Sequence, residues 1–184
     1  MPTAFQLRRA REIIQQGGVI AYPTEAVYGL GCDPANADAV LRLLSLKVRD
    51  WRKGVILIAA DIDQLRPWVD LPPSDWQQLS AQWPGPRTWV VPASAAAPDW
   101  ITGGRTEIAV RVTAHPIASA LARHAGMALV STSANPAQRP AGRSPIDVRR
   151  YFGDALDLIV SGPVDRRATP TAIRHWPDGH WLRT

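Results

Sequence analysis

Several residue types and segments are scarce in this sequence, and each scarcity excludes a class of protein. A single cysteine, Cys32, permits no internal disulfide and fits a reducing compartment. One cysteine and four scattered histidines offer no zinc-ligand spacing, so we expect no metal site built from protein side chains. No apolar run approaches the roughly 20 residues of a membrane span, and the N-terminal segment lacks the apolar core of a signal peptide. We therefore expect a cytoplasmic protein that makes no membrane contact.

The familiar nucleotide-binding signatures are also absent. The sequence has no GxxxxGK[ST] phosphate loop, no GxGxxG after a strand and no protein-kinase motif set. A phosphate site in this chain must therefore be assembled from scattered cations and from backbone amides at strand ends.

Cations are plentiful, but lysine is rare among them. The formal net charge is +5 and the isoelectric point is about 10.1, yet lysine occurs only at Lys47 and Lys53. This excess of arginine suits a polyanionic ligand, either a nucleic acid or a nucleoside triphosphate. Composition alone does not separate these two classes.

Hydrophobic periodicity and turn residues predict a chain in which helices and strands are mixed. Helices are expected from Thr3 to Gly17, from Asp33 to about Lys47, in short pieces over 61–83, from His115 to Ala125 and from Ser144 to Phe152. Strands are expected over 19–22, 55–60, 88–91, 108–112, 129–131, 158–160, 172–174 and 181–183, with a loop over 93–106. Because the two element types do not alternate strictly, we expect a single α/β domain of the α+β type over residues 1–184, with a twisted, open mixed sheet flanked by helices.

Two polar segments at strand ends are the most informative parts of the chain. The first, YPTEAVYGLG over 22–31, contains Pro23, which removes a ladder donor, and Gly29 and Gly31, which permit close approaches. The second, LVSTSAN over 129–135, has a similar polar chemistry. We expect the two segments to form two lips of one ligand site, with Thr24 and Glu25 as possible reactive groups.

Basic residues concentrate in one loop, and one arginine interrupts an apolar strand. Lys47, Arg49 and Lys53 lie between a helix end and a buried strand, where they are either solvated charges or ligands of an anion. Arg111 lies within IAVRV, either as a surface residue or as a bidentate partner of a carboxylate in a cleft.

The segment STSAN has its own alternatives. Ser133 and Asn135 either bond their own backbone in a turn or contact a ligand. A serine nucleophile is disfavoured because no GxSxG elbow surrounds it. His115 precedes Pro116 at a helix start and is expected to neighbour the cap rather than to act as a base.

Five motifs in a fixed order carry a family resemblance. YPTEAVYGLG, the basic stretch over 46–54, PGPRTWVVPA, IAVRVTAHP and LVSTSAN occur in the order typical of the YrdC-like family, and the similarity extends from the first helix to WLR at 181–183. The resemblance implies a single-domain YrdC-like fold with a basic concave cleft. It also implies a reaction in which L-threonine, bicarbonate or CO₂ and ATP, with Mg²⁺, give threonylcarbamoyl-adenylate and pyrophosphate.

The resemblance also assigns roles to residues. Lys47 and Arg49 are implied as catalytic cations; the ATP-binding set is Lys47, Arg49, Lys53, Asn135, Arg143, Ser144 and Arg183. The threonine-binding set is Thr24, Arg111, Ser133 and Thr171. The implied partner is a transferase complex that moves the threonylcarbamoyl group to the adenosine beside the anticodon of tRNAs that read ANN codons. The alternative from another class is a non-catalytic binder of structured RNA, such as tRNA, which would use the same basic surface.

Overall fold

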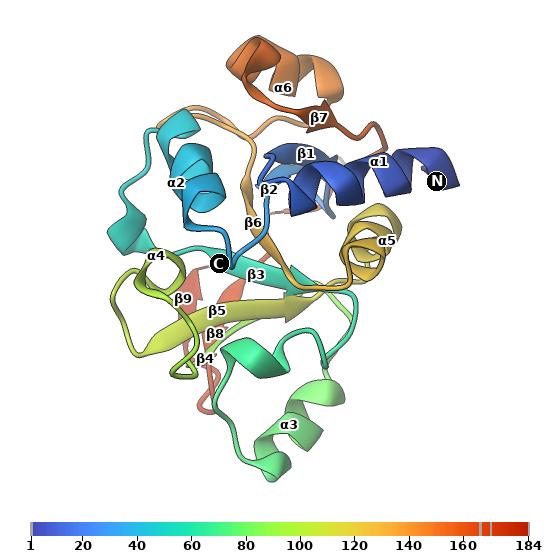
Figure 1. The fold of residues 1–184 in the computed structure, drawn as a ribbon. Helices are drawn as coiled ribbons and strands as arrows, with labels where there is room; N and C mark the ends of the chain where they lie inside the picture. The colour runs from blue at the N-terminus through green and yellow to red at the C-terminus, as the bar shows by residue number, and fades with distance from the viewer. Residues whose placement is uncertain (1, 166, 170, 184) are drawn as a thin grey trace.

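A nine-stranded mixed sheet forms the centre of the computed structural model (Figure 1). The structure describes residues 2–165, 167–169 and 171–183, and for residue 183 it describes the backbone only. The order of strands across the sheet is β7-β1-β2-β6-β3-β5-β4-β8-β9. Neighbouring strands run parallel in the pairs β1/β7, β3/β5 and β4/β8 and antiparallel elsewhere. The strands are β1 Ile20–Pro23, β2 Tyr28–Gly31, β3 Ile56–Ala59, β4 Thr88–Pro92, β5 Glu107–Val112, β6 Leu129–Ser133, β7 Leu158–Ile159, β8 Ile173–His175 and β9 Trp181–Arg183. The expected mixed sheet flanked by helices is confirmed.

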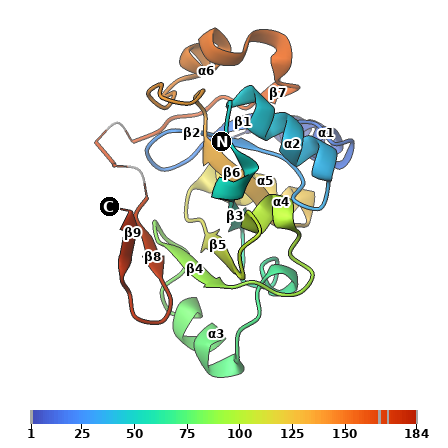
Figure 2. The same ribbon diagram turned by 90° about the vertical axis from the view of Figure 1, so that its left-hand side faces the viewer.

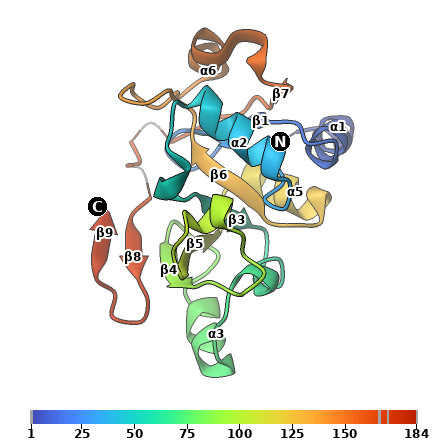
Figure 3. The ribbon, with the colours of Figure 1, turned by 60° about the vertical axis from the view of Figure 1, so that its left-hand side comes forward.

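Helices cover both faces of this sheet, as Figures 1, 2 and 3 show from three directions. The α-helices are α1 Ala4–Gln15, α2 Ala37–Leu46, α3 Pro73–Ser80, α4 Asp99–Thr102, α5 Pro116–Ala125 and α6 Pro145–Phe152, and the short 3-10 helices are Trp51–Lys53, Arg66–Trp68 and Gly153–Ala155. Helices α1 and α5 pack side by side on one face, in a core cluster that includes Ile58 and Leu129. The neighbouring strand residues, Leu57 and Val130, belong to a second cluster with α2 and α6. Because successive strand residues point to opposite faces, the central strands are buried on both sides, as the apolar run over 55–60 predicts.

Local caps explain where most of these helices begin. Thr3 and Gln6 form the expected capping box of α1, and the Ser144 hydroxyl accepts a hydrogen bond from Asp147 N, 3.1 Å away, at the start of α6. His115 is itself the cap of α5 and not its neighbour, since its Nδ1 accepts from Ala118 N at 3.4 Å.

Two expectations about local structure are wrong. Helix α2 begins after Asn36 rather than at Asp33, because the Asn36 side chain accepts from Ala39 N at 3.0 Å, whereas Asp33 instead forms a turn with Ala35 N at 2.8 Å. The segment 93–106 is not entirely a loop, because it contains the one-turn helix α4, which ends at Gly103 in the left-handed conformation.

The first polar segment forms the hairpin of β1 and β2. Thr24 closes the connection, since both its backbone N–H and its hydroxyl donate to the carbonyl of Val27, at 2.9 and 2.7 Å. Gly31 is required by close approach, because a Cβ there would lie 2.5 Å from the Val130 carbonyl and 2.8 Å from the Tyr22 ring. Within the described residues, no helix is both long and apolar enough to cross a bilayer.

Candidate active site

The two polar segments lie side by side in the sheet. Strand β2 pairs with β6 so that Gly29 stands opposite Ser133 and Leu30 opposite Thr132. A cavity of about 580 Å³ opens along this junction and extends over β3, β5, β4 and β8. The sequence-predicted site residues that line this cavity are Thr24, Arg49, Lys53, Arg111, Ser133, Asn135 and Thr171. The two segments therefore adjoin one cavity, whereas the ligand site and the roles of the individual residues stay predictions.

Three other predicted site residues, Lys47, Arg143 and Ser144, are not among the described residues that line the cavity. Lys47 is buried but does not line the cavity, and its contacts are described below. Arg143 and Ser144 form the turn before α6, where the carboxylate of Asp147 accepts from Arg143 N at 3.0 Å and the Ser144 hydroxyl caps the helix. The structure gives no description of the Arg183 side chain, so that call lies outside the described residues.

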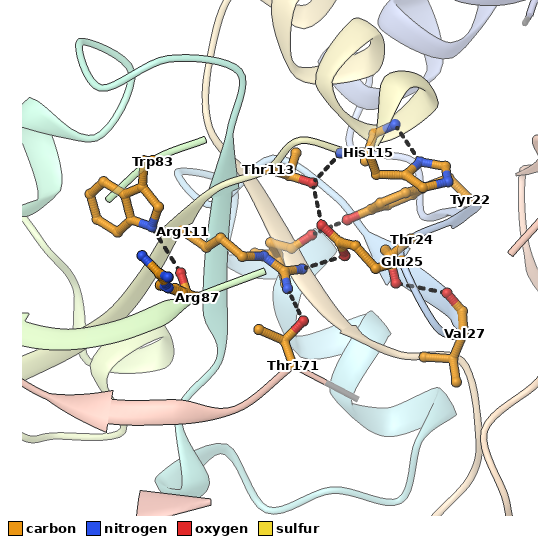
Figure 4. A network of polar contacts seen from close by, with 12 residues as sticks. Tyr22, Thr24, Glu25, Val27, Trp83, Arg87, Arg111, Thr113, His115 and Thr171 are labelled. Carbon is orange, nitrogen blue, oxygen red and sulfur yellow. Dashed lines mark hydrogen bonds and ion pairs between the residues drawn. The ribbon is translucent and has the colours of Figure 1, made fainter. Parts of the chain in front are cut away.

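Arg111 is the most deeply buried cation in the cavity wall among the described residues. Its side chain is 7% exposed, and its guanidinium bonds the Thr171 hydroxyl through Nη1 while Nη2 lies 3.4 Å from the Glu25 carboxylate (Figure 4). Strand β5 places it there, because Val110 and Val112 on either side point into the opposite core cluster. The strand position therefore holds a fixed positive charge that faces the cavity.

A chain of polar contacts through Glu25 holds the Arg111 guanidinium in place. Figure 4 shows Glu25 between Arg111 and Thr113. The Thr113 hydroxyl donates to the other Glu25 oxygen at 2.8 Å and accepts from His115 N at 3.1 Å. Burial lowers the pKa of His115, so this ring stays neutral near pH 7. Glu25, which the sequence left as a possible base, thus contacts Arg111 and Thr113 rather than lining the cavity.

The cations of the basic loop lie in two different environments. Arg49 and Lys53 line the cavity, and Arg49 also donates to the Gly54 carbonyl at 3.1 Å. Lys47 is only 4% exposed, and its ammonium donates to the carbonyls of Ser133 and Asn135. Burial, reinforced by Arg49, lowers the pKa of Lys47 to about 8.

Asn135 forms the turn that the sequence offered as one alternative, and its contact with a ligand stays a prediction. Its amide donates to the backbone carbonyls of Arg139 at 2.6 Å and Pro136 at 3.1 Å, as a turn residue does, yet Asn135 also lines the cavity. The turn is therefore fixed before any ligand arrives.

Several polar residues of the cavity wall were not predicted as site residues from the sequence; they include Thr102, Arg105, Glu107 and Thr132. Arg105 is bound to the basic loop, since it donates to the carbonyls of Arg52 at 2.8 Å and Lys53 at 3.0 Å. Glu107 contacts His175 Nε2 at 2.7 Å. The available signal for Glu107 as a site residue was its position at the start of β5, opposite Pro92. Its hydrogen-bond partner, His175, is 68 residues away in the sequence.

Metal ligands are few in the described part of the chain. It contains no group of three or more His, Cys, Asp or Glu side chains that could hold a metal ion. Glu107 is the one carboxylate among the described lining residues. A cavity of this kind offers cations, hydroxyls and backbone donors, which suit the binding and orientation of anions rather than a protein nucleophile.

Comparisons with known proteins show to which family the chain is similar. A family model for Sua5, YciO and YrdC, described as "Telomere recombination", matches residues 12–183. The chain is 55% identical to a threonylcarbamoyl-AMP synthase of Halorhodospira halophila, over 97% of this chain and 94% of that protein, and 48% identical to one of Pseudomonas aeruginosa, over 100% and 99%.

Solved structures give the same assignment. The crystal structure of P. abyssi Sua5 complexed with L-threonine superposes with a TM-score of 0.89 at 31% identity and 96% coverage of this chain; this chain spans only about half, 53%, of that one. E. coli YciO shares the fold, with a TM-score of 0.84 at 24% identity, over 100% of this chain and 93% of that one. The match over nearly the whole sequence, together with these relatives, shows that the chain belongs to the Sua5/YciO/YrdC family.

Proposed function

We propose that this chain is an enzyme that forms threonylcarbamoyl-adenylate and pyrophosphate from L-threonine, bicarbonate or CO₂, and ATP. Its relatives over nearly the full length are named for this product, and a structural neighbour was solved with L-threonine. The observation that carries the proposal is that Arg49, Lys53 and Arg111 line one cavity together with hydroxyl groups from both polar segments.

The chemistry requires such an arrangement. The threonine amine joins CO₂ to give a carbamate and a proton; starting from bicarbonate, water leaves instead. A carbamate oxygen then attacks the α-phosphorus of ATP, and the bond to the β-phosphate oxygen breaks so that pyrophosphate departs. Both reactants are anions, so electrostatic repulsion and orientation are the main obstacles, and a fixed set of cations and donors reduces both.

Each cavity residue has a role in this proposal. Arg111 would bind the threonine carboxylate, with Thr24, Ser133 and Thr171 around the rest of that substrate. Arg49 and Lys53 would bind the triphosphate, and Asn135 would contact the nucleotide. Arg143, Ser144 and Arg183 would complete the ATP site from the α6 turn and from β9. Glu25, next to Arg111 at 3.4 Å, would hold the guanidinium rather than act as a base.

Mg²⁺ would enter as part of the ATP substrate. The described cavity wall offers the single carboxylate of Glu107 and no cluster of metal-ligating side chains, which fits an ion held chiefly by phosphate oxygens. Such an ion would neutralise charge on the triphosphate, and the protein's own contribution would be Arg49 and Lys53.

The product is an activated acyl donor, which fits a place in tRNA modification. A separate transferase complex would move the threonylcarbamoyl group to the adenosine beside the anticodon of tRNAs that read ANN codons. This reaction would place the protein in the cytoplasm, and contact with tRNA would be transient.

Pyrophosphate release tests the function directly. Purified protein with Mg²⁺ and ATP is expected to release pyrophosphate only when both threonine and bicarbonate are present, and mass spectrometry should detect the adenylate. Release that is independent of threonine, or no release at all with adequate Mg²⁺, would refute the proposal. Only the absence of release would favour a non-catalytic RNA binder, which salt-dependent RNA affinity would then identify.

A further inference from the structure

The two lysines of this chain lie in one loop but in different surroundings. Lys53 lines the cavity, whereas Lys47 ends α2 and is 4% exposed. Between Lys47 and Arg49, Val48 adopts the left-handed backbone conformation, with φ at 51°. The chain therefore turns sharply after Lys47, and the cavity receives Arg49 but not Lys47.

The hydrogen-bonding capacity of the Lys47 ammonium is fully used within the protein. An ammonium group has three N–H donors. Its acceptors are the carbonyl of Ser133, the carbonyl of Asn135 at 2.7 Å and the side-chain oxygen of Asn135 at 3.4 Å. No donor of Lys47 is left for a phosphate oxygen in this arrangement.

The contact also runs in the opposite direction. The carbonyl of Lys47 accepts from Ala137 N at 2.8 Å, so the residue is bound through both its side chain and its backbone to the turn over 133–137. Ala134 N in turn donates to the Tyr28 carbonyl at 2.7 Å, which joins this turn to the first polar segment. Lys47 is thus the link between the end of α2 and both lips of the cavity.

We propose that Lys47 is a positioning residue, whose ammonium fixes the turn that carries Ser133 and Asn135 into the cavity, and is not a ligand of the triphosphate. Loss of the ammonium leaves the carbonyls of Ser133 and Asn135 without their charged donor in a partly buried place, which is costly, so the turn moves to find other partners. This inference rests on the proposed function for the identity of the substrates, but not for the structure of the turn.

Lys47→Met tests the inference, because methionine has a similar length and no charge. The amide of Ala137 is expected to exchange its hydrogen at least about tenfold faster than in the wild type. The dissociation constant for threonine without nucleotide should rise at least about tenfold, and the effect on turnover should appear in the KM for threonine rather than in kcat. Arg52→Met, an exposed cation in the same loop outside the cavity wall, is the matched control and should leave both the exchange and threonine binding unchanged.

A direct phosphate ligand would behave differently. If Lys47→Met weakened only ATP binding and left the Ala137 exchange and the threonine affinity unchanged, the inference would be overturned. If wild-type protein released no threonine-dependent pyrophosphate, the proposed function would fail, whereas faster exchange at Ala137 in Lys47→Met would still support the role in the turn.

The wild-type protein provides a second measurement that does not depend on the variant folding. Because the sequence has two lysines, labelling lysine side chains with ¹⁵N gives two ammonium signals, which Lys53→Met assigns. On addition of ATP and Mg²⁺ without threonine, the Lys53 signal should shift and the Lys47 signal should stay in place. A Lys47 shift as large as that of Lys53 would contradict the inference.

Discussion

The guanidinium of Arg111 lies 3.4 Å from the carboxylate of Glu25, and their side chains are 7% and 19% exposed. This ion pair connects β5 to the connection between β1 and β2, two segments 86 residues apart. Thr171 and Thr113 bond the same two side chains. The positive charge of Arg111 in the cavity wall is therefore held by contacts that join three parts of the chain.

Removal of the Arg111 side chain should chiefly impair the use of threonine. In Arg111→Ala, we expect kcat/KM for threonine to fall by an amount equivalent to about 2–4 kcal/mol, because a buried carboxylate would lose its charged partner. The KM for ATP should change far less. Arg123→Ala, an exposed arginine on α5, controls for the loss of one positive charge. An unchanged threonine requirement in Arg111→Ala would remove the assigned role.

Glu25→Gln should reduce stability. The amide oxygen still accepts from Thr113, but the negative charge beside Arg111 is lost, so the free energy of unfolding should fall by about 1–3 kcal/mol. Urea denaturation measures this change. Glu12→Gln, an exposed position on α1, provides the comparison and should lie within about 0.5 kcal/mol of the wild type. Equal stability of the two variants would show that the Glu25 charge does not stabilise Arg111.

Val48→Gly should stabilise the fold. Val48 has φ at 51° and is 76% exposed, so its β-branched side chain strains the backbone and loses little packing when removed. Glycine relieves the strain at some cost in unfolded-state entropy, and the net gain should be about 1 kcal/mol in the free energy of unfolding. Val48→Ala retains a Cβ and should gain less. A lower urea midpoint for Val48→Gly at an unchanged m value would contradict the strain.

The contact between His175 and Glu107 should make stability depend on pH. The hydrogen bond from the His175 ring to the Glu107 carboxylate raises the pKa of His175, with a further contribution from Asp178. A raised folded-state pKa means that the stabilisation is complete below the ordinary histidine pKa of about 6.5 and is lost as the pH rises through the folded value. Melting temperatures of the wild type and of His175→Gln, measured from about pH 5.5 to about pH 8.5, should therefore converge at the alkaline end. A gap between the wild type and His175→Gln that is independent of pH would argue against the charged contact.

Local patterns in the sequence predicted the elements well, because local physics determines them. The capping box at Thr3, the Ser144 cap and the apolar run over 55–60 each need only neighbouring residues. The start of α2 was misplaced because Asp33 and Asn36 are both good caps, and the sequence does not say which one the helix uses. Periodicity identified the other strands but missed β2, Tyr28–Gly31, and it carried no information about the order of the strands in the sheet.

The candidate site was predictable as a set of residue types, but not as a set of contacts. Seven predicted side chains line the cavity, yet Lys47 faces the turn at Ser133 instead. The directions of the Lys47 and Arg49 side chains relative to the cavity depend on the backbone conformation at Val48. Its positive φ is unusual for a β-branched residue. Glu107 was missed because its partner, His175, comes from a distant strand.

The central place of β6 has a consequence for synthesis of the protein on the ribosome. Strand β6 is the only described strand that hydrogen-bonds to both β2 and β3, and it comprises residues 129–133. A nascent chain that ends before this strand can form the first hairpin and the β3–β5–β4 group, but nothing in the ladder unites them. At a synthesis rate of roughly 5–20 residues per second, the two half-sheets would remain separate, with unpaired strand edges, for several seconds. Release of β6 from the exit tunnel closes both edges in one event and brings the second polar segment beside the first.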